Sequence, residues 1–263
     1  MPPPKVCSTW PRETKPRFAH RLRAFFAILA VAASSVVIGT VGFGFALIAA
    51  PVLLLYLEPQ QVVVVINSLI GLMLVMVLVR NWRYLELRPS LGLVLGGLAA
   101  TPIGVLALNS ASPGVLRITI AIVILVLALV SLKNIQLPFT RSRMAGPSFG
   151  FLTVLATTTI AIGGPIAAIY AISQEWKPDR IRATLALLFI TTDIVAFALY
   201  AATGLVTRDT LANIGVMIPG LILGSALAVV LVNRINDRIF RRAMIAVIVV
   251  AGSATLIREL SGA

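Results

Sequence analysis

Two short glycine-containing stretches interrupt apolar segments of the sequence, and their chemistry suits an anion. The first is Gly39-Thr40-Val41-Gly42-Phe43-Gly44, and the second, residues 157–165, is TTTIAIGGP. A break in a membrane helix frees N–H groups at the start of the next half-helix, where the positive end of the helix dipole also favours an anion. The predicted substrate-binding residues in the two breaks are Thr40, Gly42, Gly44, Thr159, Gly163, Gly164 and Pro165. The alternative is that these small residues only allow close helix packing.

A single carboxylate lies deep in an apolar segment. It is Asp193, preceded by Thr191 and Thr192. A charged group within a span is costly, so it marks a functional site by default, and we expect Asp193 to bind a coupling proton or sodium ion. Thr192 and the Asn67-Ser68 pair, which occupies a similar depth in an earlier segment, are assigned to the predicted substrate site. The alternative for Asp193 is structural pairing with neighbouring hydroxyl groups or an arginine.

Arg182 opens the apolar segment that contains Asp193. The planar guanidinium group of arginine matches a sulfonate- or sulfite-like oxyanion, so Arg182 joins the predicted substrate-binding residues. The alternative is that it anchors the helix at the membrane interface. The chain has one cysteine, Cys7, and one histidine, His20, both near the N-terminus. The sequence therefore gives no reason to expect a metal site, a cofactor or an intramembrane catalytic pair.

The composition indicates that membrane-spanning helices hold these candidate residues. Hydrophobic residues make up 59% of the 263 residues and charged residues 12%, against about 25% charged residues in soluble domains. Eight apolar segments are long enough to approach or exceed the ~20 residues of a membrane span. They cover residues 24–57, 60–79, 89–108, 113–132, 145–173, 182–203, 210–232 and 239–257. The sequence thus predicts an all-α polytopic membrane protein with about eight transmembrane helices, embedded in the lipid of the cell inner membrane.

The two halves of the sequence share a pattern. A shift of 119 positions places Gly44 on Gly163 and Pro59 on Pro178, and each half opens on a broken segment. We therefore predict a tail at 1–23, a first four-helix repeat at 24–135, a connector at 136–144 and a second repeat at 145–263. Chance similarity between apolar helices remains the alternative.

The basic residues predict the orientation. The net charge is +13, but the positive residues lie in the tail and in the loops, as the positive-inside rule requires, so nucleic acid is not an expected partner. With eight crossings, the tail, the 80–88 loop and the connector share one side, which predicts a cytoplasmic N-terminus. Residues 234–242, which hold four arginines, then fall on the other side. Either those arginines serve the substrate, or one broken segment is re-entrant.

Several motifs in this order resemble the TauE/SafE family of membrane permeases, over about residues 24–260. The resemblance rests on residues 42–51, GFGFALIAAP, on Pro102-Ile103-Gly104, on Ile162-Gly163-Gly164-Pro165 and on residues 182–186, RATLA, followed by Phe189. It implies two repeated halves and transport of sulfite or small organosulfur anions, driven by an ion gradient.

The function predicted from these features is that of a secondary transporter rather than an enzyme. A small anion would bind near the bilayer midplane between the halves, with alternating access from either side. The alternative is a non-transporting assembly or scaffold subunit of the membrane. The sequence leaves the coupling ion and a homo-oligomeric state open.

Overall fold

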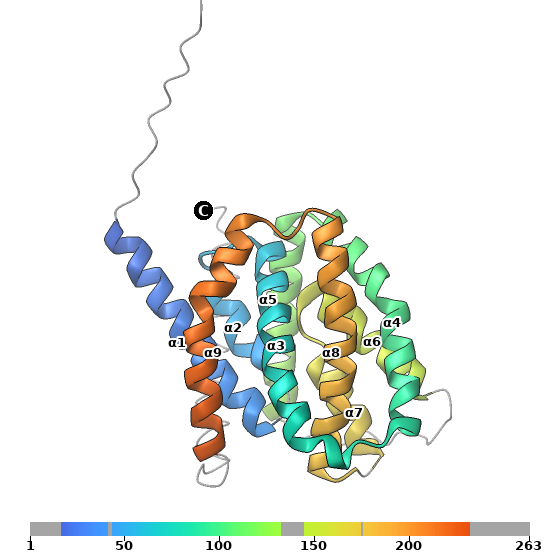
Figure 1. Cartoon of the computed structure of the whole chain (residues 1–263). Helices are drawn as coiled ribbons and strands as arrows, with labels where there is room; N and C mark the ends of the chain where they lie inside the picture. Colours follow the sequence, from blue (N-terminus) through green and yellow to red (C-terminus); the bar gives the residue numbers. More distant parts are fainter. Residues whose placement is uncertain (1–16, 42–43, 133–144, 175, 232–263) are drawn as a thin grey trace, which may run out of the picture.

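The computed structural model describes residues 17–41, 44–132, 145–174 and 176–231, and every regular element in them is helical (Figure 1). The helices are α1 (Arg17–Val41), α2 (Phe45–Leu53), α3 (Pro59–Asn81), the 3₁₀ helix η1 (Trp82–Tyr84), α4 (Leu87–Ser110), α5 (Pro113–Leu132), α6 (Ala145–Ile160), α7 (Gly164–Ser173), α8 (Pro178–Ala202) and α9 (Arg208–Leu231). The predicted eighth segment, 239–257, lies outside the described residues.

Four of the described helices are long and apolar enough to cross a membrane. They occupy Pro59–Tyr84, Ser90–Ser110, Asp179–Ala202 and Arg208–Val230, while shorter apolar helices occupy Phe25–Gly39, Pro113–Val123 and Ala145–Ile160. Large apolar side chains such as Leu72, Leu95 and Leu223 are exposed on the outer surface of the bundle, as lipid contact requires. These features agree with the predicted polytopic membrane protein, and the number of spans remains a prediction.

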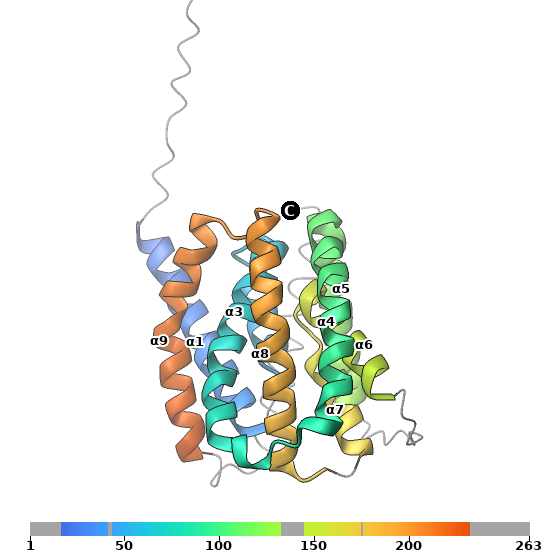
Figure 2. The ribbon, with the colours of Figure 1, turned by 45° about the vertical axis from the view of Figure 1, so that its right-hand side comes forward.

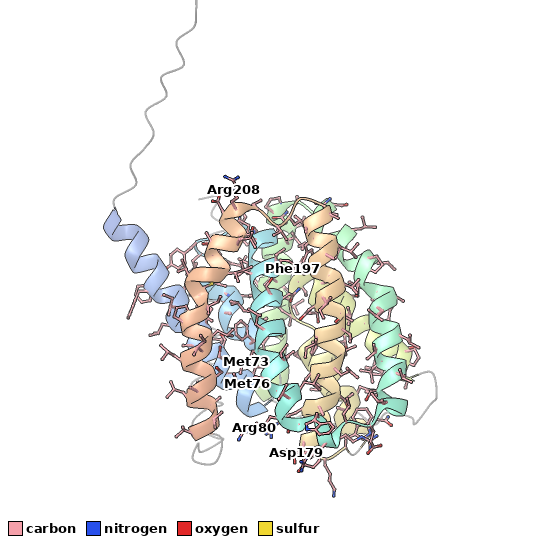
Figure 3. The ribbon with its side chains drawn as sticks, viewed as in Figure 1. Met73, Met76, Arg80, Asp179, Phe197 and Arg208 are labelled. Atoms are coloured by element: carbon pink, nitrogen blue, oxygen red, sulfur yellow. The ribbon has the colours of Figure 1, made fainter. Side chains whose placement is uncertain are left out.

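The bundle has two ends that charged residues mark clearly. Figure 3 shows Arg208 at one end and Arg80 and Asp179 at the other. We call these the Arg208 end and the Arg80 end. Helix α3 runs from the Arg208 end to the Arg80 end, and α8 runs in the opposite direction beside it (Figures 1 and 2).

Helices α1 and α2 form a hairpin that enters and leaves at the Arg208 end. Helix α1 runs parallel to α9, since a Cβ atom on Gly220 would meet the carbonyl of Ile28 and one on Gly39 would meet Ala228. Helix α2 then returns towards Pro59, the start of α3 (Figure 1). The first broken segment is therefore re-entrant. The prediction that the tail and the 80–88 loop share one side is wrong, because the hairpin places the start of α1 opposite the Arg80 end.

Helices α6 and α7 form the matching hairpin from the Arg80 end. Helix α6 runs parallel to α4, since a Cβ atom on Gly150 would collide with the carbonyl of Leu93 and one on Gly104 with Thr158. Helix α7 then returns to the Arg80 end, where α8 begins. The second broken segment is therefore also re-entrant, and the two hairpins enter the bundle from opposite ends.

The elements recur at a nearly constant offset. Helices α1 and α6 end 119 positions apart, at Val41 and Ile160, and α3 and α8 begin 119 positions apart, at Pro59 and Pro178. The packing crosses between the halves: α1 lies against α9 and α6 lies against α4. The division into two four-helix repeats stays a prediction, because the last predicted helix is not among the described residues.

A first prediction concerns the glycine contact between α4 and α6. Gly150→Ala should destabilise the protein by about 1–3 kcal/mol, because the new methyl group forces the two backbones apart. Gly215→Ala is the matched control, since no atom of the described residues lies within 4 Å of its Cβ position in α9. It should leave stability unchanged or raise it by up to about 1 kcal/mol. Thermal unfolding in detergent measures both, and equal melting temperatures would contradict the close contact.

A second prediction tests the hairpin. In a Cys7→Ser background, single cysteines at His20 and Glu58 should react with a membrane-impermeant maleimide from the same face of oriented vesicles, because both flank the α1–α2 hairpin. Cysteines at Arg83 and Lys177 should react from the other face. Labelling of His20→Cys and Glu58→Cys from opposite faces would show that the first broken segment crosses the membrane.

Candidate functional site

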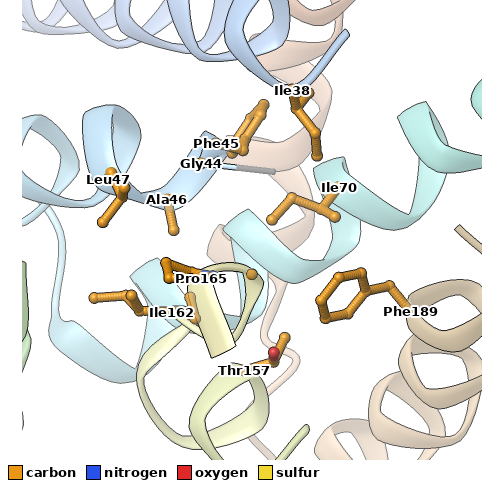
Figure 4. A pocket seen from close by; sticks show the side chains of 12 residues that line it. Ile38, Gly44, Phe45, Ala46, Leu47, Ile70, Thr157, Ile162, Pro165 and Phe189 are labelled. Carbon is orange, nitrogen blue, oxygen red and sulfur yellow. The ribbon is translucent and has the colours of Figure 1, made fainter. Parts of the chain in front are cut away.

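The breaks of the two hairpins meet at one small cavity inside the bundle. Residues 44–47 line it from the first hairpin, and Thr157, Ala161, Ile162, Gly164 and Pro165 line it from the second (Figure 4). Ile38, Ile70 and Phe189 complete its wall. Its volume is about 30 Å³, which is room for about two water molecules. The structure thus brings together residues of the two hairpins that are 110 or more positions apart in the sequence.

Left-handed backbone conformations produce both breaks. Gly44, directly before α2, has a φ of 98°, which glycine adopts without steric cost. Ala161, directly after α6, has a φ of 61°, which costs an alanine about 1–2 kcal/mol. A left-handed residue cannot continue an α-helix, so α6 ends there.

The N-terminal ends of α2 and α7 both border the cavity. The Gly44 carbonyl accepts a hydrogen bond from the Leu47 N–H at 3.2 Å, and the Gly163 carbonyl accepts one from the Ile166 N–H at 3.0 Å. These bonds close the first turn of each helix next to the cavity. The positive ends of two helix dipoles therefore converge where the side chains are mostly apolar, an arrangement that suits an anion.

A hydrogen-bonded group fixes the end of α6 beside the cavity. The Asn67 amide donates to the Thr157 carbonyl at 3.0 Å and to the Tyr200 hydroxyl at 3.2 Å. The Tyr200 hydroxyl donates in turn to the Thr158 carbonyl at 2.7 Å. Two carbonyls near the C-terminal end of α6, where the helix is broken, thus bind side chains of α3 and α8.

Asp193 lies in a separate groove between α3, α8 and α9. The groove has a volume of about 420 Å³, and Asn67, Ser68 and Gly71 lie in its lining with Asp193. Asp193 is 7% exposed, and its two carboxylate oxygens have no hydrogen-bond partner among the described residues. The structure therefore places Asn67 and Ser68 in one groove with Asp193, apart from the central cavity.

A larger polar cavity opens at the Arg80 end. Its volume is about 310 Å³. We call it the Arg80 cavity, and its lining comprises Gly39, Met73, Met76, Val77, Arg80, Asn81, Tyr84, Asp179, Arg182, Ser225, Ala228 and Val229. Arg182 thus lies in this cavity and not in the central one.

Comparison with known proteins identifies the family. The model of the family described as Sulfite exporter TauE/SafE matches residues 26–255, which is most of the chain. The chain belongs to the TauE/SafE family. No curated protein and no solved structure matches it. Membership confirms the resemblance seen in the sequence, and it makes the chain a member of a family of membrane permeases for sulfur compounds rather than of an enzyme family.

The structure separates the predicted site residues of this TauE/SafE protein into groups. Gly44, Gly164 and Pro165 line the central cavity, and Gly163 is buried directly beside it. Thr192 does not line the central cavity: it lies against Gly97 of α4, and its hydroxyl donates to the Leu188 carbonyl of its own helix at 2.9 Å. The side chain of Thr40 and the whole of Gly42 lie outside the described residues.

Two further predicted residues bond to backbone carbonyls instead of lining the central cavity. The Thr159 hydroxyl donates to the Gly104 carbonyl of α4 at 3.4 Å, and the Ser68 hydroxyl donates to the Val64 carbonyl at 2.7 Å. Tyr200 and Arg80 were not predicted as site residues. Arg80 is the first charge after the apolar stretch 60–79, and this signal could have paired it with Arg182, the charge that opens a later segment.

A third prediction concerns the Tyr200 hydroxyl. Tyr200→Phe removes the donor to Thr158 and the acceptor for Asn67, and should lower stability by about 0.6–1.7 kcal/mol, the range of polar contacts within membranes. Thr191→Val is the control, because the Thr191 hydroxyl bonds only to the Leu187 and Leu188 carbonyls of its own helix. Detergent unfolding compares the two variants. A larger loss for Thr191→Val than for Tyr200→Phe would contradict the bridging role of Tyr200.

Proposed function

We propose that this TauE/SafE chain is a secondary transporter that moves sulfite or a small organosulfur anion across the cell inner membrane, with the anion bound at the central cavity. The convergence of the starts of α2 and α7 on one cavity carries this proposal. The two helix dipoles attract negative charge, and the apolar walls strengthen that attraction because few competing water molecules are present.

The central cavity is small compared with the proposed substrate. About 30 Å³ leaves space for water but little for a polyatomic anion, so binding requires α2 and α7 to separate slightly. The hairpins enter from opposite ends, so withdrawal of one hairpin opens the cavity to one side and withdrawal of the other opens it to the opposite side. This movement is the alternating access expected of proteins built from inverted repeats, here the proposed units 24–135 and 145–263.

Asp193 is the proposed coupling residue. Its groove and the central cavity share a wall, since Asn67 lines the groove and donates a hydrogen bond to the carbonyl of Thr157, which lines the cavity. A proton or sodium ion at Asp193 would change the charge next to this hydrogen-bonded group. The position of α6 at the cavity therefore provides a physical link between ion binding and anion binding.

The proposed orientation places the Arg80 end in the cytoplasm. Residues 54–58, 111–112 and 203–207 connect helices at the Arg208 end and contain no lysine or arginine, whereas Arg83 and Lys177 lie in connections at the Arg80 end. Basic residues in short loops favour the cytoplasmic side. The start of α1, which carries Arg17, Arg21 and Arg23, then lies on the opposite side, so the proposal gives the helix connections more weight than these three arginines and departs from the predicted cytoplasmic N-terminus.

A fourth prediction tests transport in proteoliposomes. The purified protein should move at least one of sulfite, thiosulfate, sulfoacetate, taurine or sulfolactate under a proton or sodium gradient. Gly44→Ala should reduce this flux about tenfold or more, because alanine resists the φ of 98° at the cavity and its methyl group approaches Val37 to 3.3 Å.

The control variant for transport is Gly215→Ala, whose new methyl group meets no atom of the described residues within 4 Å. It should retain wild-type flux, and size-exclusion chromatography should show that both variants fold. Absence of flux for the whole panel, under either gradient, would favour the scaffold alternative over transport. Wild-type flux in Gly44→Ala would remove the central cavity from the route.

A further inference from the structure

We propose that the Arg80 cavity is a second anion site that binds a monovalent organosulfonate with a short apolar tail before the anion enters the central cavity. Its role in transport rests on the proposed function, but binding at this site does not. Helices α1, α3, α8 and α9 and the 3₁₀ helix η1 line it at the Arg80 end, with Met73 and Met76 deeper in the bundle than Arg80 (Figure 3).

The charges in this cavity favour one negative charge. Arg182 pairs with Asp179 at 3.4 Å, whereas Arg80 has no acidic partner among the described residues. These three residues carry one net positive charge. A sulfonate group carries one negative charge on three oxygens, and these oxygens can accept hydrogen bonds from guanidinium groups on two different helices.

The neighbouring Arg180 shows how an arginine with a structural role differs. Its guanidinium lies 2.9 Å from the Glu86 carboxylate and 4.6 Å from the centre of the Trp176 ring. Both contacts hold the start of α8 to the start of α4 and to the 174–177 connection. Arg180 does not line the Arg80 cavity. The basic side chains at this end therefore divide into a structural arginine and a pair that lines the Arg80 cavity.

One wall of the cavity is apolar. Met73, Met76 and Val77 of α3 and Ala228 and Val229 of α9 form it. A volume of about 310 Å³ lies at the lower end of small-molecule sites, which begin at about 300 Å³. Sulfite alone leaves most of this space and the whole apolar wall without contact. An alkyl sulfonate fills both parts, with its charged head at the arginines and its tail against the methionines.

The last turn of α1 separates this cavity from the central one. Ile38 lines the central cavity and the next residue, Gly39, lines the Arg80 cavity. The absence of a side chain at Gly39 lets this turn pack closely, since a Cβ atom there would lie 2.5 Å from the Ala228 Cβ and 3.2 Å from the Met73 Cε. The two cavities are therefore separated by this one helical turn, and the proposed path of the anion between them passes it.

Direct binding tests this inference without any flux measurement. Titration calorimetry of the purified full chain in detergent uses methanesulfonate, ethanesulfonate and propanesulfonate as probes. Affinity should rise about fourfold for each added methylene until the apolar wall is covered. Arg80→Gln and Arg182→Gln should each weaken propanesulfonate binding about tenfold or more, as expected for the loss of a charge-assisted hydrogen bond.

The matched control is Arg83→Gln, because Arg83 is exposed at the same end of α3 but does not line the cavity. It should bind propanesulfonate as the wild type does. Arg80→Lys should keep part of the affinity that Arg80→Gln loses, because lysine retains the positive charge but lacks the planar guanidinium group with its several N–H donors. Wild-type affinity in both folded glutamine variants, or an equal loss in Arg83→Gln, would overturn the inference.

Flux measurements then distinguish the two proposals. Arginine-dependent binding without transport of any anion would refute the proposed function and leave this site standing. Transport of organosulfonates that is unaffected by Arg80→Gln and Arg182→Gln would refute the site as a step on the route and leave the proposed function standing.

Discussion

Hydrocarbon offers no hydrogen bonds to backbone groups, so a helix that breaks inside a membrane must be enclosed by protein. This constraint governs the structure because two of its segments break, after Val41 and after Ile160. The breaks turn towards each other and share one cavity, and α3 and α8 pack beside them at the centre of the bundle. The Thr158 carbonyl, freed where α6 ends, accepts a hydrogen bond from Tyr200, and the Thr157 carbonyl accepts one from Asn67 in addition to the Ala161 N–H. The surrounding protein that supplies hydrogen bonds to the backbone at the breaks also keeps most water away from the point where the two helix dipoles meet.

Close packing of the outer helices makes this enclosure possible. Gly96 and Gly150 let α4 and α6 approach until backbone meets backbone, and Gly220 and Gly224 do the same for α9 and α1. In lipid no hydrophobic force drives helices together, so van der Waals contact at small residues supplies much of the cohesion. Each hairpin is thereby fixed by its longer helix to a helix of the other half. The shorter helices α2 and α7 lack such glycine contacts among the described residues, and these are the helices that end at the cavity.

The sequence predicted the helical membrane architecture, the family and the two breaks. Each of these depends on residues that are close together in the chain, such as the glycines and prolines at a break or a long apolar run. It could not predict the direction of the hairpins. The direction of α1 follows from its packing against α9, where Gly220 meets Ile28 and Gly39 meets Ala228, and these contacts join residues nearly 200 positions apart. The same limit applies to the site. Gly44 and Gly164 were predicted as site residues because they lie in the glycine-containing interruptions of apolar segments. The grouping of Arg182 with Arg80 instead depends on how α8 lies against the end of α3.

The two proposed ionic sites lie at different depths, and this separation has a physical consequence. Asp193 lies beside Gly71, midway along α3, while Arg80 and Arg182 lie at the Arg80 end. A carboxylate and an anion repel each other, and the repulsion is strongest where little water screens it. Separation lets the protein hold both without placing them in direct contact. The Asn67–Tyr200 group lies next to Asp193, on the side away from Arg80, and is bonded to the end of α6, so a change of charge at Asp193 can reach the central cavity as a movement of helices. Such a movement is the form of coupling that an alternating-access transporter requires.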